Sequence, residues 1–184
     1  MIPTRFKIQI MSASEIDRTL VRLAHEILEK TKDLDKLALI GIRRRGVPLA
    51  QRLAKKIESL ENRQIPVGEL DINLYRDDLS TVGHAPVVNS TNIPFDVTGR
   101  DIVLTDDVLY TGRTVRAALD ALFERGRPAR VQLLVLIDRG HRELPIAARY
   151  VGRTIQTSSN EIVEVKFQEI DGVEKVILVE KVTA

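Results

Sequence analysis

The sequence contains no cysteine and no tryptophan, and aromatic residues make up only 4% of the chain. Without cysteine, disulfides, thiolate nucleophiles and cysteine-ligated metal sites are excluded. The scarcity of aromatic side chains argues against the broad stacking platforms of single-strand nucleic-acid binders. No apolar run approaches the roughly 20 residues of a membrane-spanning helix, and the first ten residues lack the apolar core of a signal peptide. These absences favour a cytoplasmic protein that does not associate with a membrane.

The composition that remains is typical of a globular protein, with 184 residues, 43% hydrophobic and 29% charged. This length predicts one domain over residues 1–184 with its own hydrophobic core. A net charge of +2 says little about partners. The distribution of charge says more, because the stretch from Gly41 to Lys56 contains six basic residues and no acid, whereas Asn160 to Lys181 is acidic. One face of the protein is therefore expected to bind anions.

Strand and helix patterns alternate along the chain. Ser12 and Glu15 have capping-box spacing and begin an amphipathic helix predicted over residues 12–30. The other predicted elements are strands at 37–42, 70–75, 101–105 and 131–137, helices at 48–61 and 114–125, and a hairpin over 162–179 turning at Asp171-Gly172. This alternation predicts an α/β fold with a mainly parallel sheet flanked by helices, which binds ligands beyond the carboxyl ends of its strands.

The most informative stretch is the strand–turn–helix pattern over residues 101–114. Asp106 and Asp107 are adjacent carboxylates at the strand end, and Gly112 lies in the turn before the helix. Backbone N–H groups at a helix start can bind a phosphate, but the Gly-Lys-Ser/Thr of a nucleoside-triphosphate loop is missing. Two carboxylates would repel a phosphate, so they fit a sugar diol or a divalent cation beside it. A ribose 5′-phosphate with bound Mg²⁺ meets all three demands.

A second strand, predicted at 37–42, leads into three consecutive arginines followed by Gly46. Three guanidinium groups can neutralise a polyanion such as pyrophosphate. Two anion sites on either side of a diol site match the groups of phosphoribosyl pyrophosphate, which has a phosphate and a pyrophosphate on either side of its ribose hydroxyls. Taken one at a time, each segment has a simpler explanation, as a solvated acidic strand end or a solvated basic loop.

The segment from Val103 to Thr114 resembles the phosphoribosyl-pyrophosphate motif of type I phosphoribosyltransferases. The segments Gly41–Gly46, Leu70–Leu79 and Asp138–Pro145 extend the likeness to the bacterial family of bifunctional pyrimidine operon attenuators and uracil phosphoribosyltransferases. This resemblance covers essentially the whole chain. It implies the type I phosphoribosyltransferase fold, with a small hood at about 138–160, a C-terminal β-hairpin and a flexible active-site loop within about 71–99.

The resemblance also implies roles for individual residues. Asp106 and Asp107 would hold the ribose hydroxyls and Mg²⁺, and together with Arg45 they are the predicted catalytic residues. The predicted phosphoribosyl-pyrophosphate site comprises Asp106, Asp107, Val108, Leu109, Tyr110, Thr111, Gly112, Arg113 and Thr114. The predicted pyrophosphate loop comprises Ile42, Arg43, Arg44, Arg45 and Gly46. The predicted flexible loop begins at Tyr75, Arg76, Asp77 and Asp78. The segment predicted to bind the pyrimidine comprises Asp138, Arg139, Gly140 and His141.

The implied reaction is displacement of pyrophosphate from phosphoribosyl pyrophosphate by uracil, giving UMP, and no residue stands out as a general base. Members of the family also bind pyrimidine-operon leader mRNA when UMP or UTP is present, and they form homodimers or larger homo-oligomers. The residues that correspond to RNA-binding positions are Arg22, His25, Arg142 and Arg153. Two alternatives remain: a nucleotide-sensing RNA-binding regulator with little catalysis, and a purine phosphoribosyltransferase of the same fold. The Asp138–Pro145 segment speaks against the second.

Overall fold

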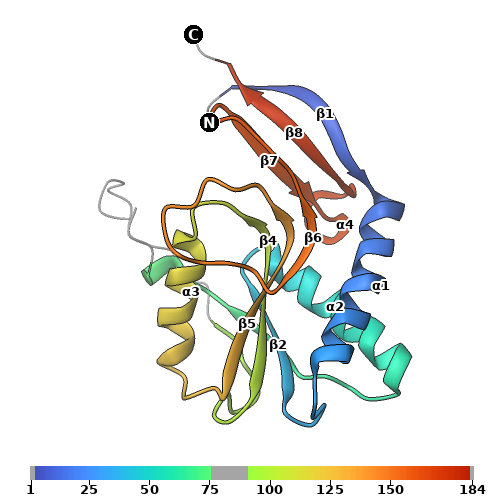
Figure 1. The fold of residues 1–184 in the computed structure, drawn as a ribbon, viewed down its shortest axis with the longest axis vertical. Coiled ribbons are helices and arrows are strands. Elements are labelled where there is room, and N and C mark those ends of the chain that lie inside the picture. Colours follow the sequence, from blue (N-terminus) through green and yellow to red (C-terminus); the bar gives the residue numbers. More distant parts are fainter. Residues whose placement is uncertain (1–2, 76–90, 183–184) are drawn as a thin grey trace.

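The structure, a computed structural model, describes residues 3–75 and 91–182. Its main sheet has five strands, all parallel, in the order β3 (Val67–Leu70), β2 (Leu37–Ile42), β4 (Asp101–Leu109), β5 (Arg130–Asp138) and β6 (Tyr150–Thr154). Helices α1 (Ala13–Lys30) and α2 (Gly46–Glu61) cover one face of this sheet, and α3 (Arg113–Phe123) covers the other (Figure 1). The predicted parallel sheet flanked by helices is confirmed.

Each face of the main sheet packs against its own hydrophobic core. All six residues of β2 are buried, as expected for a strand covered on both faces. One core joins α1 and α2 to the sheet through residues such as Leu20, Leu53 and Leu134. The other core joins α3 to the opposite face through residues such as Ile102 and Leu122. This two-sided packing fixes the carboxyl ends of β2, β4 and β5 beside one another.

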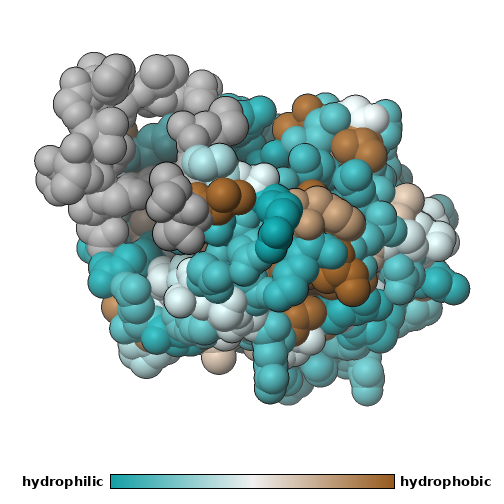
Figure 2. All heavy atoms as spheres, turned by 90° about the horizontal axis from the view of Figure 1, so that it is seen from above, coloured by the Kyte–Doolittle hydropathy of each residue, from teal (hydrophilic) through white to brown (hydrophobic). Residues whose placement is uncertain are grey.

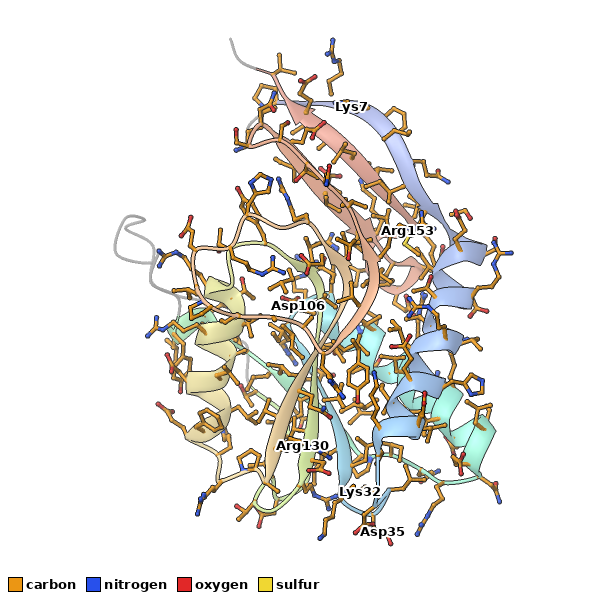
Figure 3. The ribbon with its side chains drawn as sticks, viewed as in Figure 1. Lys7, Lys32, Asp35, Asp106, Arg130 and Arg153 are labelled. Carbon is orange, nitrogen blue, oxygen red and sulfur yellow. The ribbon has the colours of Figure 1, made fainter. Side chains whose placement is uncertain are left out.

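A second, smaller sheet lies over those carboxyl ends. It is antiparallel, in the order β1 (Thr4–Ser12), β8 (Lys175–Lys181) and β7 (Glu161–Lys166), with the short helix α4 (Gln168–Asp171) between β7 and β8. Asp106 lies at the end of the main sheet that faces the small sheet, whereas Arg130 lies at the far end (Figure 3). Seen from the small-sheet side, the surface is largely hydrophilic with a few hydrophobic patches (Figure 2).

The start of α1 follows the predicted capping box. The Ser12 amide donates to Glu15 Oε2 at 2.8 Å, and the Glu15 amide donates to Ser12 Oγ. Hydrogen bonds to the Glu15 carboxylate from the Ser12 amide and the Ser12 hydroxyl, helped by Arg153, lower the pKa of Glu15 to about 2. The capping box predicted for residues 12–15 is therefore present, and the helix runs to Lys30 as expected.

Two predicted elements are wrong in form. The strand predicted at 70–75 ends at Leu70, because the side chain of Asp71 accepts a hydrogen bond from the Asn73 amide at 2.9 Å and folds the chain into the 3-10 turn η1 (Asn73–Tyr75). The antiparallel pairing of β7 with β8 is confirmed, but Asp171-Gly172 is not a two-residue hairpin turn. Asp171 ends α4, and Gly172 is its left-handed C-cap at φ 66°.

Strands β1 and β6 lie outside the predicted elements. β1 is an edge strand whose residues from Thr4 to Gln9 are exposed, so it carries no buried pattern for sequence reasoning to detect. β6 is short and only its first residue, Tyr150, is buried. Both strands take their place from pairing with distant partners, β8 and β5 respectively.

Candidate active site

The adjacent carboxylates lie inside β4, two and three residues before its end at Leu109, which corrects the prediction of a strand that stops at residue 105. The extension arises because β5 is equally long and pairs with β4 as far as Leu109 and Asp138. Neighbouring residues of a strand point to opposite faces. Asp106 is buried and Asp107 half-buried, and of the next two residues Val108 packs against the core under α1 and α2 and Leu109 into the core under α3.

Burial dominates the electrostatics of the two carboxylates. It raises the pKa of Asp106 well above its ordinary value, and repulsion from Asp107 raises it further. Burial also raises the pKa of Asp107, although hydrogen bonds from Asp106 and the Val108 amide and the positive charge of Arg45 oppose it. Two carboxylates in this environment are more stable with a shared proton or a bound cation than as two bare charges.

The turn from Tyr110 to Gly112 leads directly into α3. Gly112 is the N-cap with φ 95°, and an added Cβ would lie 3.3 Å from Ile146 Cδ1. The carbonyl of Thr111 accepts hydrogen bonds from the amides of residues 143 and 144, which fixes the turn. Arg113, one residue before the predicted helix start, begins α3, and Thr114 follows in its first turn. The helix start thus points its backbone amides toward the same edge of the sheet as the carboxylates.

The loop after β2 is packed tightly against β4. Gly46 leaves no room for a side chain, because an added Cβ would lie 2.2 Å from Thr105 O. Thr105 Oγ1 donates to Gly46 O at 2.8 Å and ties the two segments together. Ile42 is buried at the end of β2, and the peptide bond between Arg43 and Arg44 is cis. Helix α2 begins at Gly46, two residues before the predicted start.

A cavity of about 320 Å³ lies between the end of β4 and the small sheet. Arg45 and Asp107 line one side, and residues 163–166 of β7 line the other. The structure thus brings the second carboxylate of the acid pair and one arginine of the predicted pyrophosphate loop to one cavity. The side of β7, including Glu164 and Lys166, was not predicted to contribute. The acidic C-terminal composition was a signal for this region, but it did not single out these residues.

The predicted pyrimidine segment begins at Asp138, the last residue of β5, and a hydrogen bond from Arg142 to Tyr110 O ties it to the turn after β4. Burial alone would raise the pKa of Asp138, but hydrogen bonds from Arg142 Nη2 at 2.5 Å and from the Gly140 amide lower it. Arg139 is 6% exposed, and its guanidinium lies 4.1 Å from the centroid of the Tyr110 ring. It donates to Glu161 O at 2.9 Å. The guanidinium of Arg139 therefore connects the end of β5 to the segment just before β7 and to β7 itself by hydrogen bonds.

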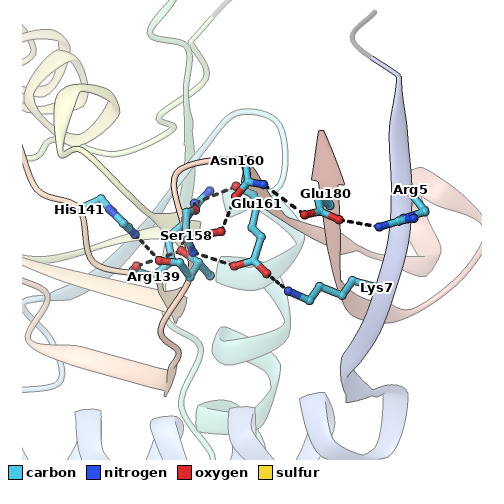
Figure 4. Close-up of polar contacts among 9 residues, drawn as sticks. Arg5, Lys7, Arg139, His141, Ser158, Asn160, Glu161 and Glu180 are labelled. Carbon is cyan, nitrogen blue, oxygen red and sulfur yellow. Dashed lines mark hydrogen bonds and ion pairs between the residues drawn. The ribbon is translucent and has the colours of Figure 1, made fainter. Parts of the chain in front are cut away.

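The same network continues into the small sheet (Figure 4). His141 Nε2 bonds the carbonyl of Thr157, and its ring packs edge-on against Tyr110 at 5.8 Å between centroids. Glu161 accepts from Lys7 and from the Ser158 amide, which lower its pKa to about 2. The loop beyond β5 is thus joined by hydrogen bonds to the edge strand β1.

The predicted RNA-binding residues do not all lie together. Arg22 and His25 are exposed on α1, where Arg22 Nη2 donates to the carbonyls of Val151 and Gly152 on β6. Arg153, also on β6, donates to Ile10 O and Glu15 Oε1, so it lies on the same side of the molecule. Arg142 instead donates to Tyr110 O and Asp138 beyond the ends of β4 and β5.

The predicted flexible loop falls largely outside the described residues. Arg76, Asp77 and Asp78 lie there, and only Tyr75 is described, with its hydroxyl donating to Glu124.

Over residues 3–75 and 91–182, no group of three or more His, Cys, Asp or Glu side chains could hold a metal ion. In the same part of the chain, no helix combines the length and apolar character needed to cross a membrane.

Comparison with known proteins places these features in context. The family model described as phosphoribosyl transferase domain matches residues 9–169. The Bifunctional protein PyrR of Pelotomaculum thermopropionicum is 61% identical over 176 residues, covering 96% of this chain and 97% of that protein. The Bifunctional protein PyrR of Thermus aquaticus is 58% identical over 177 residues, covering 96% and 98%.

Solved structures share the fold at much lower identity. A hypoxanthine-guanine phosphoribosyltransferase of Bacillus anthracis has a TM-score of 0.71 at 18% identity, covering 98% of this chain and all of that one. A hypoxanthine phosphoribosyltransferase of Trypanosoma cruzi has a TM-score of 0.73 at 18% identity, covering 95% of this chain and 92% of that one. At this identity the likeness bears on the fold alone.

Proposed function

The chain belongs to the bifunctional PyrR family of phosphoribosyltransferases, and we propose that it has both activities of a pyrimidine operon regulator. It transfers the phosphoribosyl group of phosphoribosyl pyrophosphate to uracil, giving UMP and pyrophosphate. It also regulates transcription of the pyrimidine operon by binding leader mRNA in the presence of a uridine nucleotide. The observation that carries the proposal is the 61% identity to a relative of that name over 96% of the chain.

The transfer is a substitution at C1 of the ribose. The bond from C1 to uracil N1 forms, the bond from C1 to the pyrophosphate oxygen breaks, and the N1 proton passes to solvent. Positive charge develops on the ribose in the transition state, and the carboxylates of Asp106 and Asp107 stabilise it. The amides at the start of α3 hold the 5′-phosphate, and residues 43–45 bind the pyrophosphate. Positioning and electrostatics supply the catalysis.

Asp106 and Asp107 suit Mg²⁺ by the chemistry of their donors. Mg²⁺ in nucleotide enzymes takes one or two carboxylates and completes its shell with water and substrate oxygens. Burial raises the pKa of both carboxylates and repulsion from Asp107 adds to the rise at Asp106, so the pair gains stability from a cation. When bound, Mg²⁺ supplies positive charge that stabilises the leaving pyrophosphate.

Steady-state assays test the proposed transfer. With Mg²⁺ and phosphoribosyl pyrophosphate, uracil is expected to give UMP and pyrophosphate at rates well above background. Hypoxanthine and guanine serve as competing bases, because a purine enzyme of the same fold would prefer them. Turnover with a purine but not with uracil would contradict the assignment. No turnover with any base would contradict the transferase activity and favour a regulator that only senses nucleotides.

RNA binding is supported by exposed basic and polar side chains on α1 and β6. A basic surface contacts phosphates, while unpaired loop bases supply sequence specificity. In gel-shift titrations with pyrimidine-operon leader RNA, UMP should strengthen binding, and His25→Gln should weaken it. Arg127→Gln is the matched control, because Arg127 is exposed in the loop between α3 and β5, and α3 covers the opposite face of the main sheet from α1. Binding that ignores UMP would contradict the regulatory role.

A further inference from the structure

Two arginines of the 42–46 loop are each paired with a carboxylate from outside the loop. Arg45 Nη2 donates to Asp171 Oδ1 at 2.7 Å, and Arg43 Nη2 donates to Glu69 Oε2 at 2.6 Å. Arg44 lies between them, exposed and without a hydrogen-bond or ion-pair partner among the described residues. The two outer arginines are therefore fixed at both sides of a loop whose middle arginine remains available to solvent.

Asp171 is itself firmly held. Its Oδ2 accepts the Phe167 amide at 3.0 Å, and its own amide donates to Phe167 O at 2.7 Å. Burial alone would raise the pKa of Asp171, but the hydrogen bonds from Arg45 and the Phe167 amide lower it. Asp171 is therefore a fixed, ionised partner for Arg45 near neutral pH.

The turn that carries Asp171 is clamped onto α2. The guanidinium of Arg52, on α2, binds Glu169 through Nε and Nη2 at 2.8 and 2.7 Å. It binds Glu174 through Nη1 and Nη2 at 2.6 and 2.9 Å, and it lies 5.1 Å from the ring centroid of the buried Phe167. Because Arg45 directly precedes α2, both members of the Arg45–Asp171 pair are fixed to the same helix.

Glu69 holds Arg43 from an equally rigid position. It lies in β3, opposite Gly41 of β2 in the parallel register. Its backbone also exchanges hydrogen bonds with Asn92 at 2.8 and 2.9 Å. The side chain of Glu69 is thus free to pair with Arg43 while its backbone is held by two neighbours.

Both arginines retain hydrogen-bonding capacity that the protein does not fill. Within the described part of the chain, the Nε atoms of Arg43 and Arg45 are buried and have no hydrogen-bond partner. A buried donor without an acceptor is destabilising, but these Nε atoms are closed to solvent and therefore to a ligand. The side chains of Arg43 and Arg45 are 30% and 35% exposed, and the two Nη groups of each carry four N–H donors, so one bond to a carboxylate leaves three for an anion.

We propose that Asp171 and Glu69 are positioning residues for pyrophosphate recognition, which hold the guanidinium groups of Arg45 and Arg43 in place before the ligand binds. The proposal rests on the proposed function, because that function makes residues 42–46 the pyrophosphate loop. Immobilising an arginine costs rotamer entropy, so fixing it in the free protein strengthens binding. The opposing effect is that each carboxylate partly neutralises its arginine. Removing the carboxylate should therefore weaken pyrophosphate binding if positioning dominates and strengthen it if charge neutralisation dominates.

Isothermal titration calorimetry distinguishes positioning from charge neutralisation. The protein is titrated with pyrophosphate in the presence of Mg²⁺ and, in a separate experiment, with UMP. Asp171→Asn and Glu69→Gln are each expected to raise the Kd of pyrophosphate about tenfold, equivalent to about 1.4 kcal/mol. The Kd of UMP should stay within about twofold, because UMP has no pyrophosphate group. The KM for phosphoribosyl pyrophosphate should rise about tenfold with kcat nearly unchanged. If Asp171→Asn does not fold, Glu69→Gln decides the question.

Asp17→Asn is the matched control, because it removes an ion pair with Lys56 at 2.6 Å on the surface of α1 and α2. It should change neither affinity. Unchanged or tighter pyrophosphate binding in the two test variants overturns the positioning role. Equal losses for UMP and pyrophosphate also overturn it, since they indicate a general structural role. A wild-type protein that binds neither ligand overturns the proposed function as well, whereas normal wild-type binding confines any failure to this inference.

Discussion

Substitution of Gly46 by alanine tests how closely the predicted pyrophosphate loop must approach β4. The added Cβ would lie 2.2 Å from Thr105 O and 3.4 Å from Asp106 Cα. An ordinary carbon–oxygen contact is about 3.3 Å or more. The loop and the strand must therefore separate by about 1 Å. The backbone at Gly46 is not in the left-handed region, so this steric contact is the only penalty that the methyl group introduces.

The expected cost follows from overpacking. Insertion of a methyl group into a close-packed site costs about 1–3 kcal/mol, and the upper end applies because backbone atoms on both sides must move. For a domain of this size, about 3 kcal/mol lowers Tm by about 6–12 °C. Because the displaced atoms belong to the segment that carries Asp106 and to the loop that carries Arg45, turnover should also fall. A misplacement of about 1 Å can cost up to about 10²-fold in rate.

Thermal melts and steady-state transfer assays on Gly46→Ala measure both effects. Gly99→Ala is the control, because φ is +74° there and no atom lies within 4 Å of the added Cβ. That variant should lose only the about 1–2 kcal/mol of a left-handed backbone and keep its turnover. A Gly46→Ala protein that retains the wild-type Tm and rate would refute the reasoning, since the loop could then shift without cost.

Three further predictions concern single side chains. Asp107→Asn should reduce kcat about 10²–10³-fold in steady-state assays. Its Tm should stay the same or rise, because burial disfavours the charged form of Asp107. A collapse in Tm with full turnover of the folded fraction would count against a catalytic role for Asp107. The pKa of Glu161 lies at about 2 in the folded protein instead of 4.5, so its contribution to stability is present above pH 4.5 and is lost as pH falls toward 2. Glu161→Gln should therefore flatten the fall of Tm between pH 5 and pH 3, and an unchanged profile would exclude this contribution. Arg139→Lys should lower stability by about 2–4 kcal/mol in chemical denaturation, because lysine cannot satisfy the buried acceptors of the guanidinium; a loss below about 0.5 kcal/mol would show that those hydrogen bonds are dispensable.

Features set by local chemistry were predictable from the sequence. The capping box of Ser12 and Glu15 depends on residues three apart, and the structure has it as predicted. The positive φ of Gly112 at the start of α3 likewise follows from a short segment that must turn from a strand into a helix. The order of strands and helices was enough to predict a parallel sheet whose strand ends carry the candidate site.

Features set by distant pairing were not predictable. Arg45 and Asp171 are 126 positions apart, and no local pattern joins them. Arg142 was assigned to RNA binding by the resemblance to the family, and only the fold places the Tyr110 carbonyl within 2.8 Å of its guanidinium. The Asp171-Gly172 dipeptide suits both a hairpin and a helix end, and packing of α4 against α2 through Arg52 favours the helix end. The predicted hood at about 138–160 and the roles of individual site residues stay predictions.

The pairing of β1 with β8 has a consequence for how the protein acquires its shape. Arg5 and Glu180 meet across these strands although 175 positions separate them, whereas β4 and β5 are joined by a single short helix and its turns. Contacts between residues so far apart form slowly, because the chain must first lose the freedom of the long loop between them. The parallel sheet is thus expected to condense early and the small sheet late, so that a newly synthesised chain reaches its final form only when its two outermost strands come together.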